Sequence, residues 1–319
     1  MANFRGIIKD IIQNVEDVVL GKRTVIELAL AAQLGGGHVL LEDVPGVAKT
    51  ILVRTLAITS GCTFSRIQCT PDLLPSDVSG VSIFNQKSRE FEFRRGPIFT
   101  QIVVADEINR ATPRTQSAFL EAMAEGQVSI DGKTRSLEQP FTVFATQNPV
   151  EHEGTFPLPE AQLDRFMMKL SVGYPSIQDE TKILESTRVS HPVDRIKPVT
   201  DPETLLAMQA SVRDIFVHEK VREYILRVVN RTRDSTHLSL GASPRAAMAL
   251  FRACQAFAAV QGRGYAIPDD VKVLADPVLR HRLILNPESR LRRVTQQSVL
   301  DGVLKEVPVP AGGGSNWRS

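Results

Sequence analysis

Residues 38–57 restrict the fold of this chain more strongly than any other stretch. Their pattern indicates a short buried strand at 39–41, a tight loop at 42–48 and a helix that begins at about Lys49. A strand that turns sharply into a helix leaves backbone N–H groups free at the helix N-terminus. Such groups bind phosphate through hydrogen bonds and the positive end of the helix dipole. The stretch therefore predicts nucleotide binding, with an ordinary turn and a solvated lysine as the alternative.

The loop matches the phosphate-binding pattern G-x-x-x-x-G-K-[ST] only in part. Asp43 stands where the pattern has its first glycine, Ala48 stands at the second, and Gly46 is the only glycine inside the loop. Lys49 supplies a cation that can reach the outer phosphates, and the hydroxyl of Thr50 can ligate Mg²⁺. Because the match is incomplete, the rest of the chain must decide between the two interpretations.

Composition sets broad limits on the protein. The chain has 319 residues, of which 42% are hydrophobic, so it is long enough for two domains with real cores. Its net charge of +2 is close to balance and does not call for nucleic acid or an anionic membrane as a partner. We expect no membrane segment and a cytoplasmic location, because no apolar run is long enough and the N-terminus lacks the form of a signal peptide. The three cysteines lack metal-binding spacing and are expected to be small buried residues: Cys62, Cys69 and Cys254.

The order of elements predicts two architectures in sequence. Strands alternate with helices through 1–190, which predicts an α/β domain with a parallel sheet between helical layers. Residues 191–308 predict a small all-helical domain, and 309–319 a disordered tail in which Trp317 is incidental to function. Helices are expected at about 179–189, 202–213, 219–234, 244–261 and 268–283, and prolines 192, 198 and 202 mark a linker.

Two hairpins interrupt the α/β pattern. Alternating runs at 81–84 and 90–94 flank the polar residues 85–88. A second pair of runs flanks Asp131-Gly132, which is a strong two-residue turn signal. We therefore expect hairpins at about 80–96 and 126–140.

Polar residues follow two further buried strands. The apolar run 102–105 ends in Asp106 and Glu107, and the run 141–145 is followed by Asn148. The carboxyl ends of parallel strands form one edge of a sheet, where ligands of open α/β folds bind. Asp106 would hold Mg²⁺ and Glu107 would polarise the attacking water. Asn148 would orient that water or contact the γ-phosphate. A solvated strand end and a simple Asn-Pro turn are the alternatives.

Two arginines are candidates for contacts with the γ-phosphate. Arg165 ends a short helical turn, where it either pairs with Asp164 or Glu160 or acts as an arginine finger in a neighbouring subunit's site. Arg245 lies in the first turn of a helix that Ser243 caps and Pro244 begins, so its guanidinium can face a phosphate. An ordinary surface arginine is the alternative there.

These motifs follow one another in an order that is similar to that of an AAA+ ATPase. The residues that make up these motifs resemble those of the MoxR family, and the resemblance covers about residues 4–308. The motifs that carry this resemblance are the phosphate loop, Ala-Asp-Glu-Ile-Asn-Arg-Ala at 105–111, Ala-Thr-Gln-Asn-Pro at 145–149, Leu-Asp-Arg-Phe at 163–166, Gly-Ala-Ser-Pro-Arg-Ala at 241–246, Thr-Pro-Asp-Leu-Leu-Pro-Ser-Asp at 70–77 and Phe-Pro-Leu-Pro-Glu-Ala-Gln-Leu-Asp-Arg-Phe at 156–166.

The resemblance implies an AAA+ αβα sandwich followed by a helical lid domain, with ATP and Mg²⁺ as ligands. It implies catalytic roles for Lys49, Glu107, Asn148 as sensor 1, Arg165 as the arginine finger and Arg245 as sensor 2. It implies metal ligation by Thr50 and Asp106. The nucleotide-binding residues that it implies are Val19, Gly21, Val44, Pro45, Gly46, Val47, Ala48, Lys49, Thr50, Ile51 and Asp106.

The resemblance also carries expectations about assembly. The two hairpins would line or flank the pore of a hexameric ring, and Arg110 would contact a neighbour. Ala48 is similar to many MoxR members. Asp43 departs from the loop pattern, and we expect its carboxylate to point away from the nucleotide.

We therefore expect an ATP-hydrolysing, hexameric chaperone-like protein. The family resemblance implies that its partner is a client or adaptor protein. Partners of this family often contain a von Willebrand factor A domain. One alternative is a nucleic-acid motor, because the hairpin tips carry Lys87, Arg89, Lys133 and Arg135. The balanced charge argues against nucleic acid. The other alternative is a scaffold that binds ATP without hydrolysis, which the presence of both Glu107 and Arg165 argues against.

Overall fold

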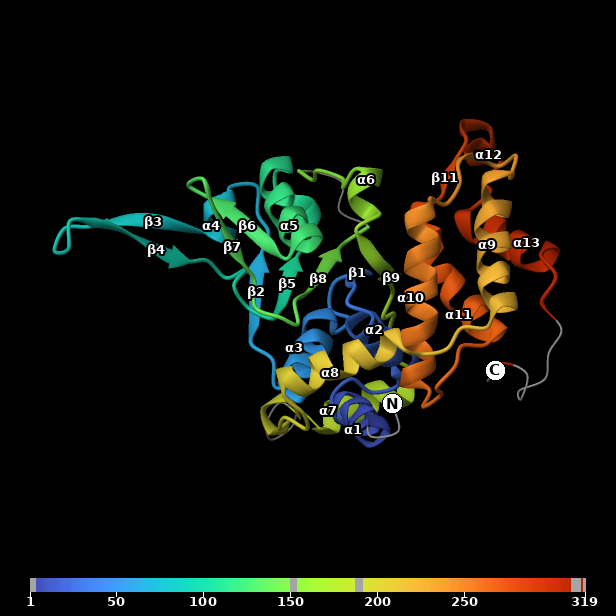
Figure 1. Cartoon of the computed structure of the whole chain (residues 1–319), viewed down its shortest axis with the longest axis horizontal. Helices are drawn as coiled ribbons and strands as arrows, with labels where there is room; N and C mark the ends of the chain where they lie inside the picture. Colours follow the sequence, from blue (N-terminus) through green and yellow to red (C-terminus); the bar gives the residue numbers. More distant parts are fainter. Residues whose placement is uncertain (1–3, 150–153, 187–191, 311–316, 318–319) are drawn as a thin grey trace.

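The computed structural model describes residues 4–149, 154–186, 192–310 and 317. An α/β part and a helical part lie side by side, and a long hairpin projects from the α/β part on the side away from the helices (Figure 1). The predicted boundary at 190/191 lies outside the described residues. Within the described residues, no helix is long and apolar enough to cross a membrane.

The centre of the α/β part is a parallel sheet of five strands in the order β2-β5-β8-β1-β9. The inner strands β5, β8 and β1 are almost wholly buried because both faces of the sheet are covered, and every residue of β5 is buried, whereas the edge strand β2 is mostly half-buried or exposed. Strand β1 therefore lies inside the sheet, between β8 and β9, which confirms the predicted parallel α/β fold. The strands are β1 (His38–Glu42), β2 (Phe64–Gln68), β5 (Ile102–Asp106), β8 (Thr142–Gln147) and β9 (Phe166–Leu170).

Alternation along the strands divides the core between the two faces of the sheet. Val39 and Leu41 belong to one apolar cluster, which includes buried residues of α1, α2 and α3. Leu40 belongs to the other cluster, together with Phe119 and Leu120 of α5. The sheet is thus covered on both sides, as a three-layer sandwich requires. The helices of this part are α1 (Arg5–Glu16), α2 (Arg23–Leu34), α3 (Lys49–Thr59), α4 (Pro75–Ser79), α5 (Pro113–Glu125), α6 (Glu160–Leu163) and α7 (Ile177–Ser186).

The C-terminal part is a bundle of helices that packs against the β9 edge of the sheet. Helix α10 contacts both α2 and α11, so a single apolar cluster runs through the two parts. The lid is not wholly helical as predicted, because a small antiparallel pair, β10 (Leu238–Leu240) and β11 (Ile284–Leu285), joins two of its loops. The helices are α8 (Pro202–Arg213), α9 (Glu219–Arg233), α10 (Pro244–Val260), α11 (Pro268–Leu279), α12 (Pro287–Leu291) and α13 (Gln296–Glu306).

One helix ends earlier than predicted. The helix expected to reach residue 283 ends at Leu279 and continues as a 3₁₀ turn, Arg280–Arg282. The turn carries Arg282 into a buried position, where its guanidinium donates to the carbonyl of Phe166 (2.7 Å). A tertiary contact therefore sets the end of this helix, and helical periodicity alone could not reveal it.

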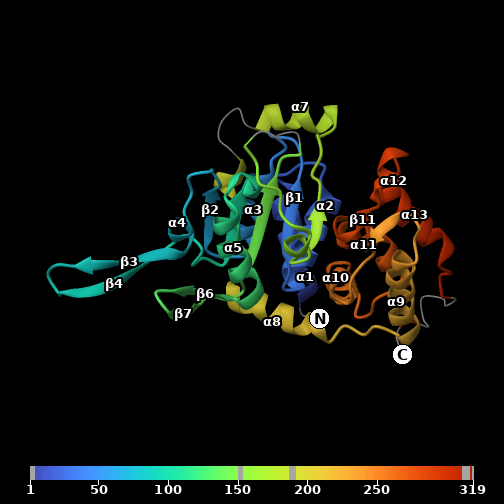
Figure 2. The same ribbon diagram turned by 90° about the horizontal axis from the view of Figure 1, so that it is seen from above.

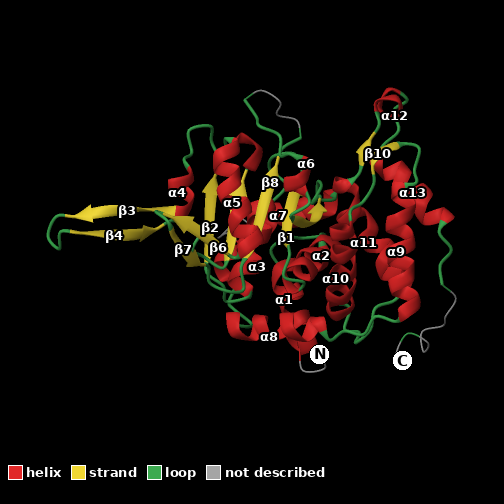
Figure 3. Ribbon diagram, turned by 45° about the horizontal axis from the view of Figure 1, so that its top comes forward, coloured by secondary structure: helices red, strands yellow, loops and turns green. Residues whose placement is uncertain are grey.

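Both predicted hairpins are present. Strands β3 (Gly80–Asn85) and β4 (Glu90–Arg95) form the long arm that stands away from the sheet in all three views (Figures 1, 2 and 3). Strands β6 (Gln127–Ile130) and β7 (Lys133–Ser136) form the second hairpin, between α5 and β8.

Two of the smaller predictions have different outcomes. The cysteines are buried and unpaired as expected, and burial raises the pKa of Cys62 and Cys69 to about 12. Trp317, which the sequence analysis treated as incidental to function, is only 4% exposed and packs edge-on against His218, with ring centroids 5.6 Å apart. Most of the predicted disordered tail lies outside the described residues.

Candidate nucleotide site

The loop after β1 and the ends of β5 and β8 meet at one edge of the sheet. They enclose a pocket of about 330 Å³. The pocket gathers most of the predicted site residues and adds two that the sequence analysis missed, Arg66 and Thr146. It is lined by Pro45, Gly46, Val47, Ala48, Lys49, Thr50, Ile51, Arg66, Asp106, Glu107, Thr146 and Asn148.

The backbone of the loop explains its incomplete match to the phosphate-binding pattern. Ala48, directly before α3, is in the left-handed region with φ 61°, and Gly46 has φ 84°. Glycine is the usual residue in such a conformation, because an L-residue there costs about 1 kcal/mol. Ala48 adopts the conformation without a large side chain, and no side chain caps the N-terminus of α3. Ala48 thus takes the backbone conformation that the second glycine of the pattern would take.

Asp43 anchors the loop to the segment after β9. Its Oδ2 accepts hydrogen bonds from the backbone N–H of Gly173 (2.5 Å) and the hydroxyl of Ser171 (2.8 Å), and its Oδ1 accepts from the N–H of Val44 (3.0 Å). Burial raises the pKa of this carboxyl, but these hydrogen bonds outweigh it and hold the pKa below its ordinary value. The carboxylate is therefore used within the protein, in agreement with the expectation that it turns away from the nucleotide.

Lys49 is folded against its own loop. Its ammonium donates to the carbonyl oxygens of Asp43 (2.5 Å) and Val44 (3.2 Å). A phosphate in the pocket would compete with these carbonyls for the ammonium. Lys49 thus has a place inside the pocket and a defined arrangement from which to engage a phosphate.

The donor set beside Lys49 fits a magnesium ion. The hydroxyl of Thr50 lies 3.4 Å from Oδ2 of Asp106. Adjacent ligands of an octahedral Mg²⁺ are about 2.9 Å apart, so a small adjustment would let both oxygens reach one ion. Thr146 donates to Oδ1 of Asp106 (2.5 Å) and accepts from the backbone N–H of Glu107 (2.8 Å). Thr146 therefore fixes both predicted carboxylate residues at once.

Glu107 is held in an uncommon conformation beside the pocket. Its backbone is left-handed, with φ 56°. Its Oε2 accepts hydrogen bonds from Arg110 (3.0 Å) and Gln68 (3.0 Å). A non-glycine residue kept in this backbone region by its surroundings is typical of functional sites. Arg110, predicted to contact a neighbour, here contacts Glu107 of its own chain.

Arg66 is the main residue that the sequence analysis did not identify. It lies on β2, which pairs with β5 in parallel register. Its Nε and Nη2 both donate to Oδ2 of Asp106, at 2.9 and 2.7 Å. The strand alternation of β2 places Arg66 and Gln68 on one face, but only knowledge of the strand order could bring them next to Asp106.

The two predicted arginine contacts lie away from this pocket. Arg165 donates to the backbone carbonyl of Leu120 (2.9 Å), and its alternative partner Asp164 is instead paired with Arg282 (2.7 Å). Burial lowers the pKa of Arg282, Asp164 raises it, and the nearby charge of Arg245 lowers it further. Neither Arg165 nor Arg245 lines the pocket of its own chain.

Three residues that the resemblance linked to the nucleotide do not line the pocket. Val19 is a core residue, only 4% exposed. Gly21 has φ 70°, and a side chain there would collide with the carboxylate of Asp179 on α7. Val44 packs at the edge of the apolar core. Contact of Val19, Gly21 and Val44 with the nucleotide thus stays a prediction.

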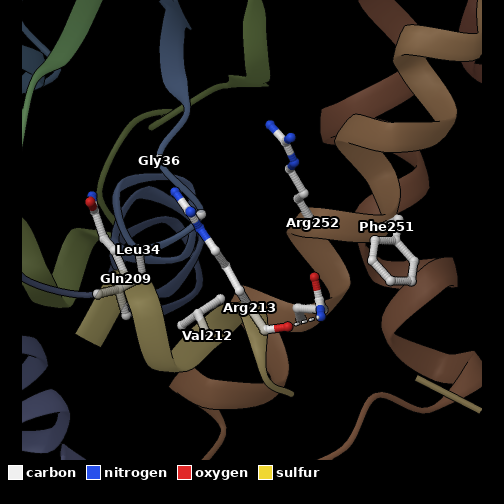
Figure 4. Close-up of a pocket in the computed structure, with 9 residues that line it drawn as sticks. Leu34, Gly36, Gln209, Val212, Arg213, Phe251 and Arg252 are labelled. Atoms are coloured by element: carbon white, nitrogen blue, oxygen red, sulfur yellow. Dashed lines mark hydrogen bonds between the residues drawn. The ribbon is translucent and has the colours of Figure 1, made fainter. Parts of the chain in front are cut away.

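A second hollow of about 450 Å³ lies where α2, α8 and α10 meet (Figure 4). Arg213 and Arg252 project beside it, and the side chain of Gln255 donates to the backbone carbonyl of Arg213 (3.0 Å). None of the described residues that line it is acidic. It lacks the carboxylates and the phosphate loop of the first pocket and belongs to the junction between the two parts.

The fold and the pocket together define a phosphate-loop ATPase of the AAA+ class. The family model described as "ATPase family associated with various cellular activities (AAA)" matches residues 38–168, and a model described as "AAA lid domain" matches 230–303.

Individual relatives narrow this class. The chain is 50% identical to the Bacillus subtilis protein YeaC, over 94% of this chain and 93% of that protein. It is 44% identical to chaperone MoxR1 of Mycobacterium tuberculosis, over 93% of this chain and 80% of that protein. The crystal structure of a candidate ATPase from Cytophaga hutchinsonii matches with a TM-score of 0.90 at 39% identity, covering 97% of this chain and 96% of the other. The chain belongs to the MoxR family of AAA+ ATPases.

Proposed function

We propose that the pocket binds and hydrolyses ATP with Mg²⁺, and that this activity drives chaperone-like remodelling of a partner protein. The observation that carries the proposal is the position of Lys49 and Thr50 in one pocket with Asp106 and Glu107. The loop supplies the phosphate-binding backbone, the ammonium and the hydroxyl. The strand ends supply the carboxylates that such chemistry requires.

Each residue has a defined part in this proposal. The free N–H groups at the start of α3 bind the phosphates, and Lys49 leaves its loop carbonyls to contact the outer ones. Thr50 and Asp106 would hold Mg²⁺, which would supply positive charge against the negative charge of the transferred group. Glu107 orients the attacking water, and Asn148 contacts the γ-phosphate. Val19 and Gly21 flank the adenine.

The site is completed by a neighbouring subunit in a homo-oligomer, which we propose is a hexamer. Neither Arg165 nor Arg245 lines the pocket of its own chain, Arg165 follows Asp164, which pairs with Arg282, and the charge of Arg245 lowers the pKa of that same Arg282. Two arginines outside their own pocket suit a phosphate site on the next subunit of a ring. We therefore assign Arg245 to the neighbour's γ-phosphate, and not to that of its own chain.

The partner is a client or adaptor protein in the cytoplasm. One relative bears the name chaperone MoxR1, which supports a remodelling role. A partner with a von Willebrand factor A domain is the more specific form of this proposal, and it rests on family resemblance.

The nucleic-acid alternative loses one of its proposed contacts in the structure. Arg135 stacks on the ring of Phe93, with its guanidinium carbon 3.9 Å from the ring centroid, and its Nε is buried. It is therefore engaged within the protein, whereas Lys87, Arg89 and Lys133 remain at exposed hairpin positions. Tight DNA binding with a steep salt dependence would favour a nucleic-acid motor.

The ATPase rate as a function of protein concentration tests the proposal. The wild type should gain specific activity as subunits assemble, while Glu107→Gln and Arg165→Ala should each lose at least about 100-fold. The Glu107→Gln protein should still bind ATP and can be used to capture the partner. Binding of ATP without turnover by the wild type at any concentration would favour the scaffold alternative. A specific ATPase activity that does not change with protein concentration would contradict a site shared between subunits.

A further inference from the structure

The carboxylate assigned to the metal is already fully engaged. Thr146 donates to Oδ1 of Asp106, while Nε and Nη2 of Arg66 both donate to Oδ2. Oδ2 is also the oxygen that lies 3.4 Å from the hydroxyl of Thr50. The Arg66 guanidinium therefore binds the one carboxylate oxygen that a metal between Thr50 and Asp106 would use.

An arginine and a magnesium ion cannot share this oxygen without conflict. Both are cations, and their repulsion at contact distance is strong in a site that is partly shielded from water. Two N–H donors also occupy the lone pairs of Oδ2 that would face the metal. The side chain of Arg66 is 51% exposed, whereas that of Asp106 is only 12% exposed. Arg66 therefore has more room to change its conformation. The arginine is thus the partner that can move.

We propose that Arg66 is a displaceable counter-ion of Asp106, which holds the carboxylate in place and leaves it when a Mg²⁺–nucleotide complex binds. The inference rests on the proposed nucleotide site and adds a positioning residue that sets the metal dependence of binding. Arg66 neutralises the buried carboxylate and keeps it pointed toward Thr50. It also raises the Mg²⁺ concentration that binding requires, because the ion must displace it.

Gln68 supports the guanidinium from a second side. Nη2 of Arg66 donates to Oε1 of Gln68 (2.7 Å), and Nε2 of Gln68 donates to Glu107 (3.0 Å). Displacement of Arg66 therefore breaks its hydrogen bond to Gln68 as well as its pair with Asp106. Loss of the Gln68 side chain should ease displacement, but less than loss of Arg66 itself.

Binding of a fluorescent ADP derivative tests the proposal without turnover. Its dissociation constant is measured in EDTA and across a Mg²⁺ titration, for the wild type, Arg66→Ala, Arg66→Gln and Gln68→Ala. The Mg²⁺ concentration at which the change in ADP affinity is half complete should fall by about threefold to tenfold in Arg66→Ala. Arg66→Gln, which retains donors but no charge, should give an intermediate shift, and Gln68→Ala a smaller one in the same direction.

Arg54→Ala is the matched control. Arg54 lies on α3, is 52% exposed and forms an ion pair with Asp194 at 3.9 Å, so this change also removes one arginine and one half-exposed pair. Its Mg²⁺ dependence should equal that of the wild type. Arg66→Gln keeps the test informative if Arg66→Ala does not fold.

Three results would overturn the proposal. The first is an unchanged Mg²⁺ half-point in both Arg66 variants. The second is an equal loss of affinity in EDTA and in Mg²⁺, which would make Arg66 a direct phosphate ligand. The third is no ADP binding by the folded wild type under any condition, which would also remove the proposed function. The first two leave nucleotide binding by the wild type intact, so they separate failure of this inference from failure of the function.

Discussion

Single residues at the ends of strands tune both the stability and the chemistry of this protein. His38 opens β1 and is buried, with Nδ1 accepting from the backbone N–H of Val143 (3.0 Å). Its Nε2 lies 3.0 Å from the carbonyl of Met123, so the neutral tautomer with hydrogen on Nε2 satisfies both contacts. Burial lowers the pKa of His38 from 6.5 to about 4, despite the opposing effect of the Met123 carbonyl.

The buried histidine predicts a pH dependence of stability. Because the folded-state pKa lies below the unfolded value, the unfolded chain binds the proton more tightly, and stability falls as the pH drops from 6.5 toward 4. We expect the wild type to lose about 2 kcal/mol more of its unfolding free energy than His38→Gln does between pH 7 and pH 5. Denaturant unfolding at several pH values measures the difference. Parallel pH profiles for the two proteins would contradict this expectation.

Thr146 predicts a different effect at the residue scale. In Thr146→Val the carboxylate of Asp106 and the N–H of Glu107 each lose a hydrogen-bond partner in a buried place. The unfolding free energy should fall by about 1–3 kcal/mol. Thr146→Ser keeps the hydroxyl and should retain most of the stability. Equal stability of the valine and serine variants would show that the hydroxyl does not stabilise the strand ends.

The sequence could predict the common location of residues that follow a visible apolar run along the chain. Lys49, Asp106 and Asn148 follow strands that apolar runs make visible, so their common edge was predictable. Arg66 and Thr146 were missed because their partners come from other strands. Their roles depend on β2 pairing with β5, and β5 with β8, which no local pattern specifies.

At the scale of elements, the two hairpins were predictable from alternation and turns, but their contact with each other was not. Arg135 of β7 stacks on Phe93 of β4, which also packs edge-on against Phe99 at 5.7 Å. Arg95 of β4 pairs with Glu138, just after β7, at 3.3 Å. The long arm is therefore joined at its base to the hairpin that leads into β8.

A double-mutant cycle tests this junction. We expect Phe93→Leu and Arg135→Met to show a coupling of about 1 kcal/mol in unfolding free energy, because a partly buried cation over an aromatic face is stabilising. Phe84→Leu combined with Arg135→Met is the control. Phe84 packs against the ring of Phe91, with centroids 5.3 Å apart, whereas Arg135 lies over the ring of Phe93, so these two effects should add. Additivity of the Phe93 and Arg135 effects would mean that the stacking does not couple the hairpins.

At the scale of the whole molecule, the α/β part carries the pocket, and Arg165 and Arg245, which the proposed function assigns to a neighbour's phosphate, lie outside it. Helix α10, which carries Arg245 in its first turn, packs against α2 and β9. Arg282, from the turn after α11, pairs with Asp164, the residue before Arg165. This division suits a ring in which each interface is one complete site.

Mixing two inactive variants tests this division. A Glu107→Gln subunit retains Arg165, and an Arg165→Ala subunit retains Glu107. In oligomers assembled from equal amounts of both, about one quarter of the interfaces combine the two intact residues when assembly is random. ATPase activity should therefore return to about one quarter of the wild-type rate, because no subunit has to be complete by itself.

A matched mixture separates this result from simple stabilisation of the ring. Lys49 and Glu107 line the same pocket of one chain. A mixture of Glu107→Gln with Lys49→Ala therefore contains no site with both residues intact, whichever subunits adjoin, and its activity should stay at the level of the single variants. Recovery in this second mixture, or none in the first, would mean that Arg165 does not act on the neighbouring subunit's nucleotide. Arg165 and Arg245 would then have to serve the packing of the lid against the core.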